Sequence, residues 1–289
     1  MRGMLDHSMS VGDAIGWGAA ALEQSDDVFR TSRADATLLL RHVLQIPHAE
    51  LFAYRERHLT MLQTQTYQAL INERLKGKPI QYITGEQEFF GLPFRVTPDV
   101  LIPRPETEHL VEAAIARMEN LPAPRIVDVG TGSGAIAVAL AHSLPHARVV
   151  ALDISGAALA IAQQNAQQNG VAARIRFMES DLLAAAAGER FDAVVSNPPY
   201  VALSERNSLA KEVRDFEPPL ALFAGPTGLE IYERLIRQAA DALECGGWLM
   251  LEIGYGQRNA IAQMLRGWSA VEFIPDLQNI PRVALAQRV

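Results

Sequence analysis

Residues 194–201, with the sequence VVSNPPYV, place polar and aromatic side chains directly after a buried-strand pattern. Proline gives no backbone N–H to a sheet and biases the preceding residue away from helix, so the strand must end here. The side-chain carbonyl of Asn197 and the backbone carbonyl of Pro198 can each accept one N–H of a substrate NH₂ group. Pro199 helps to stiffen the loop, and Tyr200 can lie against a flat amide. The loop is therefore a stiff, polar and aromatic candidate for a catalytic and substrate-binding site.

A second candidate site follows the first strand pattern, RIVDVG, at residues 125–130. Glycines at alternate positions let the backbone turn tightly and let a ligand approach where a Cβ would collide. The spacing is G-x-G-x-G rather than the dinucleotide pattern G-x-G-x-x-G, and Asp128 lies inside the strand end. A tight turn that binds nothing is the alternative. We interpret the loop as a cofactor-binding site made of Gly130, Thr131, Gly132, Ser133 and Gly134.

Asp153 ends the second strand pattern and is the third candidate. A carboxylate at this point can accept both hydroxyls of a ribose, although it could also serve only as a helix cap before Ser155. In an open α/β sheet, ligands bind beyond the carboxyl ends of the strands. A nucleoside held by the glycine loop and Asp153 would therefore point its reactive end at residues 197–200.

Composition restricts the function classes. The chain has 289 residues, of which 49% are hydrophobic and 20% charged, and a net charge of −7 that gives no general attraction for nucleic acid. Its single cysteine, Cys245, cannot form an internal disulfide, and no cluster suggests a metal site. There is no apolar run of about eighteen residues and no signal-peptide pattern, so we expect a cytoplasmic protein without a membrane span.

The secondary structure that must position these residues is predicted to change near residue 85. Apolar residues recur at helical spacing from about residue 10 to 76, and two short β-like runs then flank Gly91-Leu92-Pro93 as in a hairpin. Strand and helix patterns alternate afterwards, and two last runs are too closely spaced for a parallel crossover. We predict a doubly wound α/β sheet of seven strands with an antiparallel last strand. The expected parts are a helical substrate-recognition domain (1–85), a β-hairpin linker (86–100) and the α/β domain (101–289).

The α/β pattern, the glycine loop and Asn-Pro-Pro-Tyr together resemble the class I S-adenosylmethionine-dependent methyltransferases. Within that class, the Asn-Pro-Pro-Tyr group methylates nitrogens attached to an sp² carbon. The resemblance implies S-adenosyl-L-methionine as cofactor and S-adenosyl-L-homocysteine as product. It also implies that the nitrogen held by Asn197 is the methyl acceptor.

A narrower resemblance spans nearly the whole chain. The segments 77–112, which contains LIPRPETE, and 213–232, VRDFEPPLALFAGPTGLEIY, are similar to the release-factor glutamine methyltransferases. That family methylates the glutamine amide of the Gly-Gly-Gln motif in class I peptide-chain release factors and gives N5-methylglutamine. The resemblance implies cofactor contacts from residues 130–134, Asp153, Asp181, Leu182 and Asn197, and a release factor as protein partner.

Two positions depart from the family pattern. Leu182 stands where close relatives can carry an aromatic residue, and Thr227 stands where the family often has Asp. The residues from Arg104 to Thr107 match the family, but a proline-started helix with acids in its first turn explains them nearly as well. We therefore leave them outside the predicted site.

Other functions stay open at this point. A ribosomal-protein glutamine methyltransferase would share the fold and the chemistry, although LIPRPETE favours the release-factor branch. A nucleic-acid adenine or guanine N-methyltransferase would share Asn-Pro-Pro-Tyr, but it usually needs a basic groove, and residues 1–85 hold equal numbers of basic and acidic side chains. A noncatalytic nucleotide-binding module is the remaining alternative.

Overall fold

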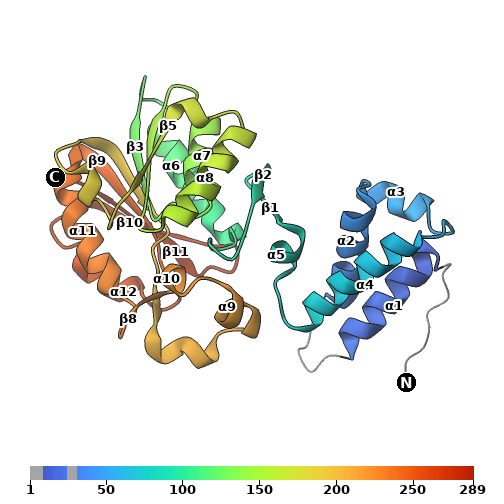
Figure 1. Cartoon of the computed structure of the whole chain (residues 1–289). Coiled ribbons are helices and arrows are strands. Elements are labelled where there is room, and N and C mark those ends of the chain that lie inside the picture. The colour runs from blue at the N-terminus through green and yellow to red at the C-terminus, as the bar shows by residue number, and fades with distance from the viewer. Residues whose placement is uncertain (1–8, 25–30) are drawn as a thin grey trace. The chain divides into compact units, whose positions relative to one another are not determined.

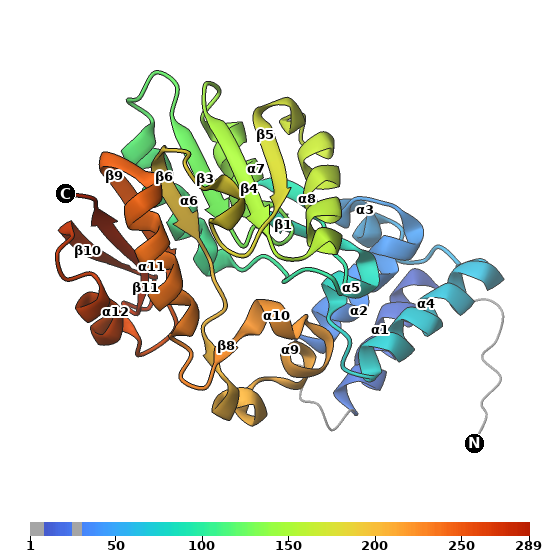
Figure 2. The same ribbon diagram turned by 60° about the vertical axis from the view of Figure 1, so that its left-hand side comes forward.

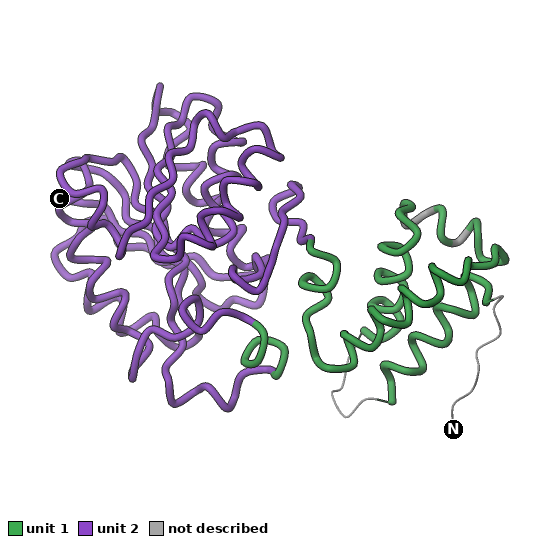
Figure 3. Tube along the Cα trace, in the orientation of Figure 1, with its two compact units in different colours: residues 1–85, 211–216 green, residues 86–210, 217–289 purple. Residues whose placement is uncertain are grey.

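The computed structural model describes residues 9–24 and 31–289 and divides into two compact units (Figure 1, Figure 3). Unit 1 contains residues 1–85 together with 211–216. Unit 2 contains residues 86–210 and 217–289. The short segment 211–216 therefore belongs to unit 1, although the chain on both of its sides belongs to unit 2.

Unit 1 is helical, as the spacing of apolar residues predicts. Two of its helices begin with side-chain caps: Ser10 Oγ accepts the Asp13 N–H at 3.1 Å, and Thr60 and Gln63 form a reciprocal capping box. The helices are α1 (Val11–Glu23), α2 (Ser32–Leu44), α3 (His48–Ala53), α4 (Met61–Leu75), α5 (Ile80–Thr84) and α9 (Lys211–Phe216).

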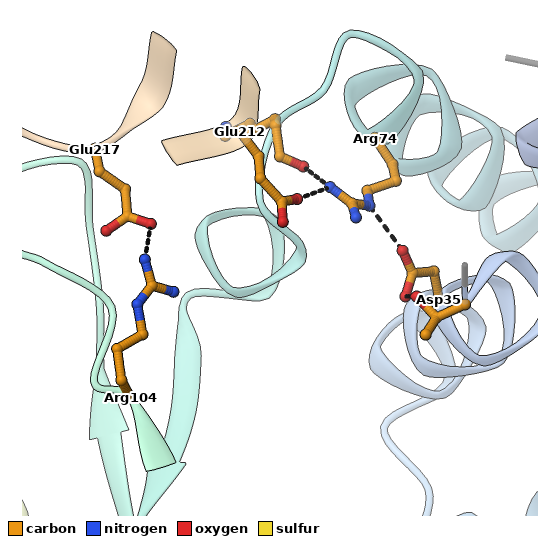
Figure 4. A network of polar contacts seen from close by, with 7 residues as sticks. Asp35, Arg74, Arg104, Glu212 and Glu217 are labelled. Carbon is orange, nitrogen blue, oxygen red and sulfur yellow. Dashed lines mark hydrogen bonds and ion pairs between the residues drawn. The ribbon is translucent and has the colours of Figure 1, made fainter. Parts of the chain in front are cut away.

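Ion pairs of the buried Arg74 link three of these helices (Figure 4). Arg74 of α4 donates from Nε to Asp35 of α2 at 2.8 Å and from Nη1 to Glu212 of α9 at 2.9 Å. The Arg74 and Asp35 side chains are buried, whereas Glu212 is half exposed. Removing one member of a buried pair leaves an uncompensated charge, typically at a cost of about 3–5 kcal/mol. Arg74 therefore connects α9 to the other helices of unit 1.

The predicted hairpin is present at the start of unit 2. Strands β1 (Glu86–Phe89) and β2 (Leu92–Arg95) pair antiparallel, with Glu88 opposite Pro93. The chain reverses at Phe90 and Gly91, so Leu92 and Pro93 belong to the second strand rather than to the turn. Pro93 is tolerated because a two-stranded ribbon has an unpaired edge, where a missing N–H breaks no ladder bond.

The main sheet of unit 2 confirms the predicted class. Its order is β10-β11-β9-β6-β3-β4-β5, with β9, β6, β3, β4 and β5 parallel and β11 antiparallel to both of its neighbours. The strands are β3 (Arg125–Val129), β4 (Arg148–Asp153), β5 (Ile175–Glu179), β6 (Phe191–Ser196), β9 (Leu243–Glu252), β10 (Ser269–Pro275) and β11 (Pro281–Gln287).

Helices cover both faces of this sheet (Figure 2). Neighbouring strand residues point to opposite faces, so Ile126 packs with the cluster around α6 (Glu108–Met118) and α7 (Ala135–Ser143), whereas Val127 packs with the cluster around α11 (Glu230–Ala242) and α12 (Arg258–Met264). Helix α8 (Gly156–Gln168) joins the first of these clusters through Ala166. Burial on both faces explains the continuous apolar runs of the strands.

Short elements complete unit 2. They are η1 (Pro105–Thr107), η2 (Ala172–Arg174), η3 (Ala184–Ala186), β7 (Val201–Ala202), η4 (Leu203–Ser208), α10 (Pro219–Leu222) and β8 (Phe223–Gly225). Element η3 forms a short helical turn within the alanine-rich segment 182–188. Cys245 is exposed. Within residues 9–24 and 31–289, none of the helices has the length and apolarity needed to cross a bilayer.

Candidate active site

A pocket of about 270 Å³ lies at the carboxyl ends of the parallel strands of unit 2. Its wall includes residues from the loops that follow β3, β4, β5 and β6, as the strand-end rule predicts. Further wall residues come from the segment before α6 and from α10 and α11. The glycine loop, Asp153, Asp181 and Asn197 are thus brought to one pocket, although almost seventy positions separate the first from the last in sequence.

The glycine loop is fixed to the end of β4. The N–H groups of Gly130 and Thr131 both donate to the Leu152 carbonyl, at 2.8 and 2.9 Å, and Gly132 N–H donates to Asp153 Oδ2 at 2.8 Å. Gly132 has a φ of 54°, and a Cβ built there would meet no atom within 4 Å. The open space at Gly132 is therefore pocket space.

The last glycine of the motif has a different role. Gly130, Thr131, Gly132 and Ser133 line the pocket, whereas Gly134 is not among its wall residues. Gly134 precedes α7 with a φ of 81°, and a Cβ there would lie 3.0 Å from the Ala162 Cβ of α8. Close packing of α7 against α8 accounts for this glycine.

Burial shifts the pKa values of Asp128 and Asp153 upward. Asp128 is completely buried, and its Oδ2 accepts from Thr131 Oγ1 at 2.6 Å and from Ala137 N–H at 3.2 Å. Burial raises the pKa of Asp128 to about 7. Burial also raises the pKa of Asp153, while backbone N–H groups, those of Ser155 and Gly132 among them, oppose that shift.

Asp153 lines the pocket, and the cap of α8 is a different residue. Ser155 is the N-cap, and its Oγ accepts the Ala158 N–H at 3.2 Å. Asp153 accepts the Ser155 N–H at Oδ1 and the Gly132 N–H at Oδ2, one at each oxygen. Each carboxylate oxygen has a further lone pair for a ligand hydroxyl.

Asp181 and Leu182 line the pocket after β5. Asp181 is exposed and forms a 2.6 Å ion pair with Arg234 of α11, which also lines the pocket. Leu182 has a φ of 53° and is partly buried against the apolar cluster of β6 and α11. Ile154, which follows Asp153, is an exposed apolar side chain in the same wall that the sequence analysis does not select.

The Asn-Pro-Pro-Tyr loop contributes Asn197 and Pro199 to the pocket wall. Pro198 is buried, and neither it nor Tyr200 is among the wall residues. The Tyr200 ring packs against the cluster that covers the α11 face of the sheet, and its carbonyl accepts from Gln257 Nε2 at 2.9 Å. The geometry therefore gives Asn197 the most direct access to a ligand among these four residues.

A set of polar residues next to Asn197 and in the pocket wall also lies outside the predicted set: Arg104, Thr107 and Glu252. Asn197 Nδ2 donates to Thr107 Oγ1 at 3.1 Å, and Thr107 Oγ1 donates to Glu252 Oε2 at 2.6 Å. Arg104 lines the pocket and pairs with the buried Glu217 (Figure 4). The resemblance through LIPRPETE contains Arg104 and Thr107 and is the signal that could have found them.

Thr227 has a structural explanation. Its N–H and Oγ1 both donate to Glu230 Oε1, at 2.8 and 2.9 Å, so it stabilises the first turn of α11. Within the described ranges 9–24 and 31–289, no group of three or more His, Cys, Asp or Glu side chains is arranged to hold a metal ion.

Comparisons with known proteins place the chain among methyltransferases. Residues 108–213 match the family described as Methyltransferase small domain, and residues 13–85 match the PrmC N-terminal domain. The chain is 45% identical over 257 residues to the release factor glutamine methyltransferase of Koribacter versatilis, which covers 89% of this chain and 91% of that one. The corresponding protein of Chlorobaculum tepidum is 47% identical over 230 residues, with coverages of 76% and 78%.

A solved methyltransferase structure from Pyrococcus furiosus is also similar, with a TM-score of 0.52 and 18% sequence identity. The match covers 76% of this chain and 97% of that one. At this identity the likeness concerns the fold alone.

Proposed function

The chain belongs to the family of release factor glutamine methyltransferases, and on that premise we propose that it methylates the glutamine of the Gly-Gly-Gln motif in class I peptide-chain release factors. The methyl group moves from S-adenosylmethionine to the side-chain amide nitrogen, giving N5-methylglutamine and S-adenosylhomocysteine. The observation that carries the proposal is Asn197, whose carboxamide lines the same pocket as the glycine loop and Asp153.

Three features of the pocket support the proposal that it binds S-adenosylmethionine. Gly132 leaves space that a Cβ would occupy, Asp153 offers carboxylate lone pairs to ribose hydroxyls, and Leu182 gives an apolar surface for adenine. When bound, S-adenosylmethionine supplies a methyl group activated by a sulfonium. The residues proposed to contact it are Gly130, Thr131, Gly132, Ser133, Asp153, Leu182 and Asn197. Gly134 lets α7 pack against α8, and Asp181 lines the pocket while it is paired with Arg234.

The Asn-Pro-Pro-Tyr loop is proposed to hold the substrate. An amide nitrogen is a poor nucleophile because its lone pair is delocalised, so the enzyme must orient it. Asn197 Nδ2 is engaged by Thr107, which leaves Asn197 Oδ1 as an acceptor for one substrate N–H. The Pro198 carbonyl would accept the other, while Pro199 and Tyr200 keep the loop in place.

Unit 1 is proposed to recognise the protein substrate. A single glutamine side chain offers few contacts, so binding energy must come from the rest of the release factor. In this scheme residues 1–85 recognise the substrate, 86–100 link the parts, and 101–289 form the methyltransferase domain. We expect no direct nucleic-acid binding, and a cytoplasmic location follows from a substrate that acts in translation.

A methyl-transfer assay tests this function. Radiolabelled S-adenosylmethionine is incubated with the protein and, separately, a release factor, ribosomal proteins or DNA. We expect label in the release factor alone, located by mass spectrometry at the glutamine of Gly-Gly-Gln. A release factor with that glutamine replaced by alanine is the matched control and should stay unlabelled. Label in ribosomal protein or DNA, with none in the release factor, would overturn the proposal.

A further inference from the structure

Glu252 is the last residue of β9 and is only 3% exposed. Its Oε2 accepts a 2.6 Å hydrogen bond from Thr107 Oγ1, and Thr107 is 4% exposed. Thr107 Oγ1 also lies 3.1 Å from Asn197 Nδ2. The three side chains therefore form a hydrogen-bonded chain that leads from a buried carboxyl group to the pocket wall at Asn197.

The donors and acceptors in this series of hydrogen bonds fix which group donates at each step. A threonine hydroxyl has one hydrogen to donate, and an ionised carboxylate can only accept. Thr107 therefore donates to ionised Glu252 and must accept from Asn197. Only the carboxamide nitrogen of Asn197 can donate, so that nitrogen faces Thr107 and the oxygen is turned away from it.

Protonation of Glu252 removes this constraint. A carboxylic acid can donate to the Thr107 oxygen, and the Thr107 hydrogen is then available to the Asn197 oxygen in a flipped carboxamide. The flipped side chain would present an NH₂ group, which cannot accept the N–H of a substrate amide. The orientation of Asn197 is therefore enforced only while Glu252 is ionised.

We propose that Glu252 and Thr107 are positioning residues, which hold the Asn197 carboxamide with its oxygen directed at the substrate amide. The inference rests on the proposed methyl transfer to an amide nitrogen. Thr107 lines the pocket and holds Asn197 directly, whereas the carboxyl group of Glu252 is not part of the pocket wall and acts on the Asn197 side chain from behind it.

The surroundings of Glu252 set the pH at which the constraint operates. Burial raises the pKa of Glu252 to about 7, and the charge of Glu106 adds to this, whereas Thr107, Arg282 and Asn197 act in the opposite direction. The tyrosines nearby are Tyr200 and Tyr232, and Tyr232 donates from its hydroxyl to the Glu252 backbone carbonyl at 2.8 Å. The orientation of Asn197 is kept above this pKa and lost below it, so methyl transfer should fall as the pH falls through about 7.

The test is single-turnover methyl transfer to intact release factor at saturating S-adenosylmethionine, measured across the neutral pH range. We expect the wild-type rate to show an acidic limb with a midpoint near pH 7. In Glu252→Gln the plateau rate should fall about 10-fold, as expected for the loss of one orienting hydrogen bond to a charged group. The acidic limb should disappear, because glutamine does not titrate, and cofactor affinity by calorimetry should stay within about twofold.

A matched pair at Thr107 separates positioning from packing. Thr107→Val keeps the shape and removes the hydroxyl, whereas Thr107→Ser keeps the hydroxyl and removes a methyl group. We expect Thr107→Ser to keep the acidic limb of the pH profile and most of the rate, and Thr107→Val to lose both. This pair decides the question even if Glu252→Gln fails to fold.

Two results are distinguishable failures. The first is that the wild-type enzyme methylates the release factor, and that Thr107→Val or Glu252→Gln keeps both the acidic limb and an undiminished rate. This result would overturn the positioning role alone. A folded wild-type enzyme that binds S-adenosylmethionine but labels no release factor would overturn the proposed function and the inference with it.

Discussion

The two sides of the pocket are built in different ways. On the side of β3 and β4, the wall is largely backbone: Gly130 and Thr131 donate to a carbonyl of β4, and Gly132 donates to Asp153. On the side of β6, the acceptor is a side chain, Asn197, which is held by the hydroxyl of Thr107. The first side is fixed by strand register, and the second depends on a chain of side-chain hydrogen bonds.

This difference assigns a separate role to each side of the pocket within our proposal. A backbone cradle moves little when one side chain is changed, so it suits a cofactor that must bind in one pose before every turnover. A side-chain acceptor can be aimed at a single nitrogen and responds to the protonation of its partners. Substitutions on the first side should therefore alter cofactor affinity, and those on the second side should alter the chemical step.

The largest expected effect is that of Asn197→Ala, which removes the acceptor. We expect kcat in single-turnover methyl transfer to fall by about two orders of magnitude, as for the loss of one preorganised polar contact. Affinity for S-adenosylmethionine by calorimetry should fall less than about threefold. A near wild-type rate would show that the Asn-Pro-Pro-Tyr loop is a structural turn and would remove the contrast between the two sides.

Asp153→Ala should give the opposite pattern. Charge-assisted hydrogen bonds to ribose hydroxyls are worth roughly 1.5–3 kcal/mol each, so we expect cofactor affinity to fall at least about tenfold. The rate at saturating cofactor should change much less. Calorimetry and single-turnover kinetics on the same preparation measure both quantities. An affinity loss below about threefold would assign Asp153 only to holding the glycine loop.

Gly132→Ala should have a smaller effect, and Gly170→Ala is its matched control. Both glycines have positive φ, 54° and 70°, and neither would place a Cβ within 4 Å of another atom. Alanine in this conformation costs roughly 1–2 kcal/mol, so both variants should lose similar thermal stability. Only Gly132→Ala should weaken S-adenosylmethionine binding, by about fivefold or near 1 kcal/mol. Equal affinities in the two variants would show that the cofactor does not approach this loop.

The same contrast explains what the sequence could predict. The strands are visible as apolar runs because both faces of the sheet are buried, and the glycine loop is visible because its conformation depends on adjacent residues. Asp153 is found because it directly ends a strand pattern. These features are local in sequence, so periodicity and turn chemistry are enough to locate them.

The rest depends on contacts between distant residues. Thr107 and Glu252 are separated by 145 positions, and nothing near either one indicates that they meet. Arg74 and Glu212 are separated by 138 positions, so the place of α9 in unit 1 is equally hidden. Pro93 shows that local sequence can also misplace a strand boundary. Proline usually ends a strand, but Pro93 lies within one strand of a two-stranded ribbon.

The smallest effect is expected for Asp181→Ala, which also serves as a control for Asp153→Ala. Both carboxylates follow neighbouring strands and line the pocket, but Asp153 accepts two backbone N–H groups and is partly buried, whereas Asp181 is exposed and paired with Arg234. An exposed ion pair contributes about 0–1 kcal/mol, so its removal should change cofactor affinity by about twofold or less. Calorimetry with S-adenosylmethionine at two salt concentrations makes the measurement specific, because a surface charge effect is screened by salt and a direct hydrogen bond is not. A loss as large as that of Asp153→Ala, independent of salt, would mean that Asp181 binds the cofactor directly. The cofactor side of the pocket would then depend on side chains as much as the substrate side does.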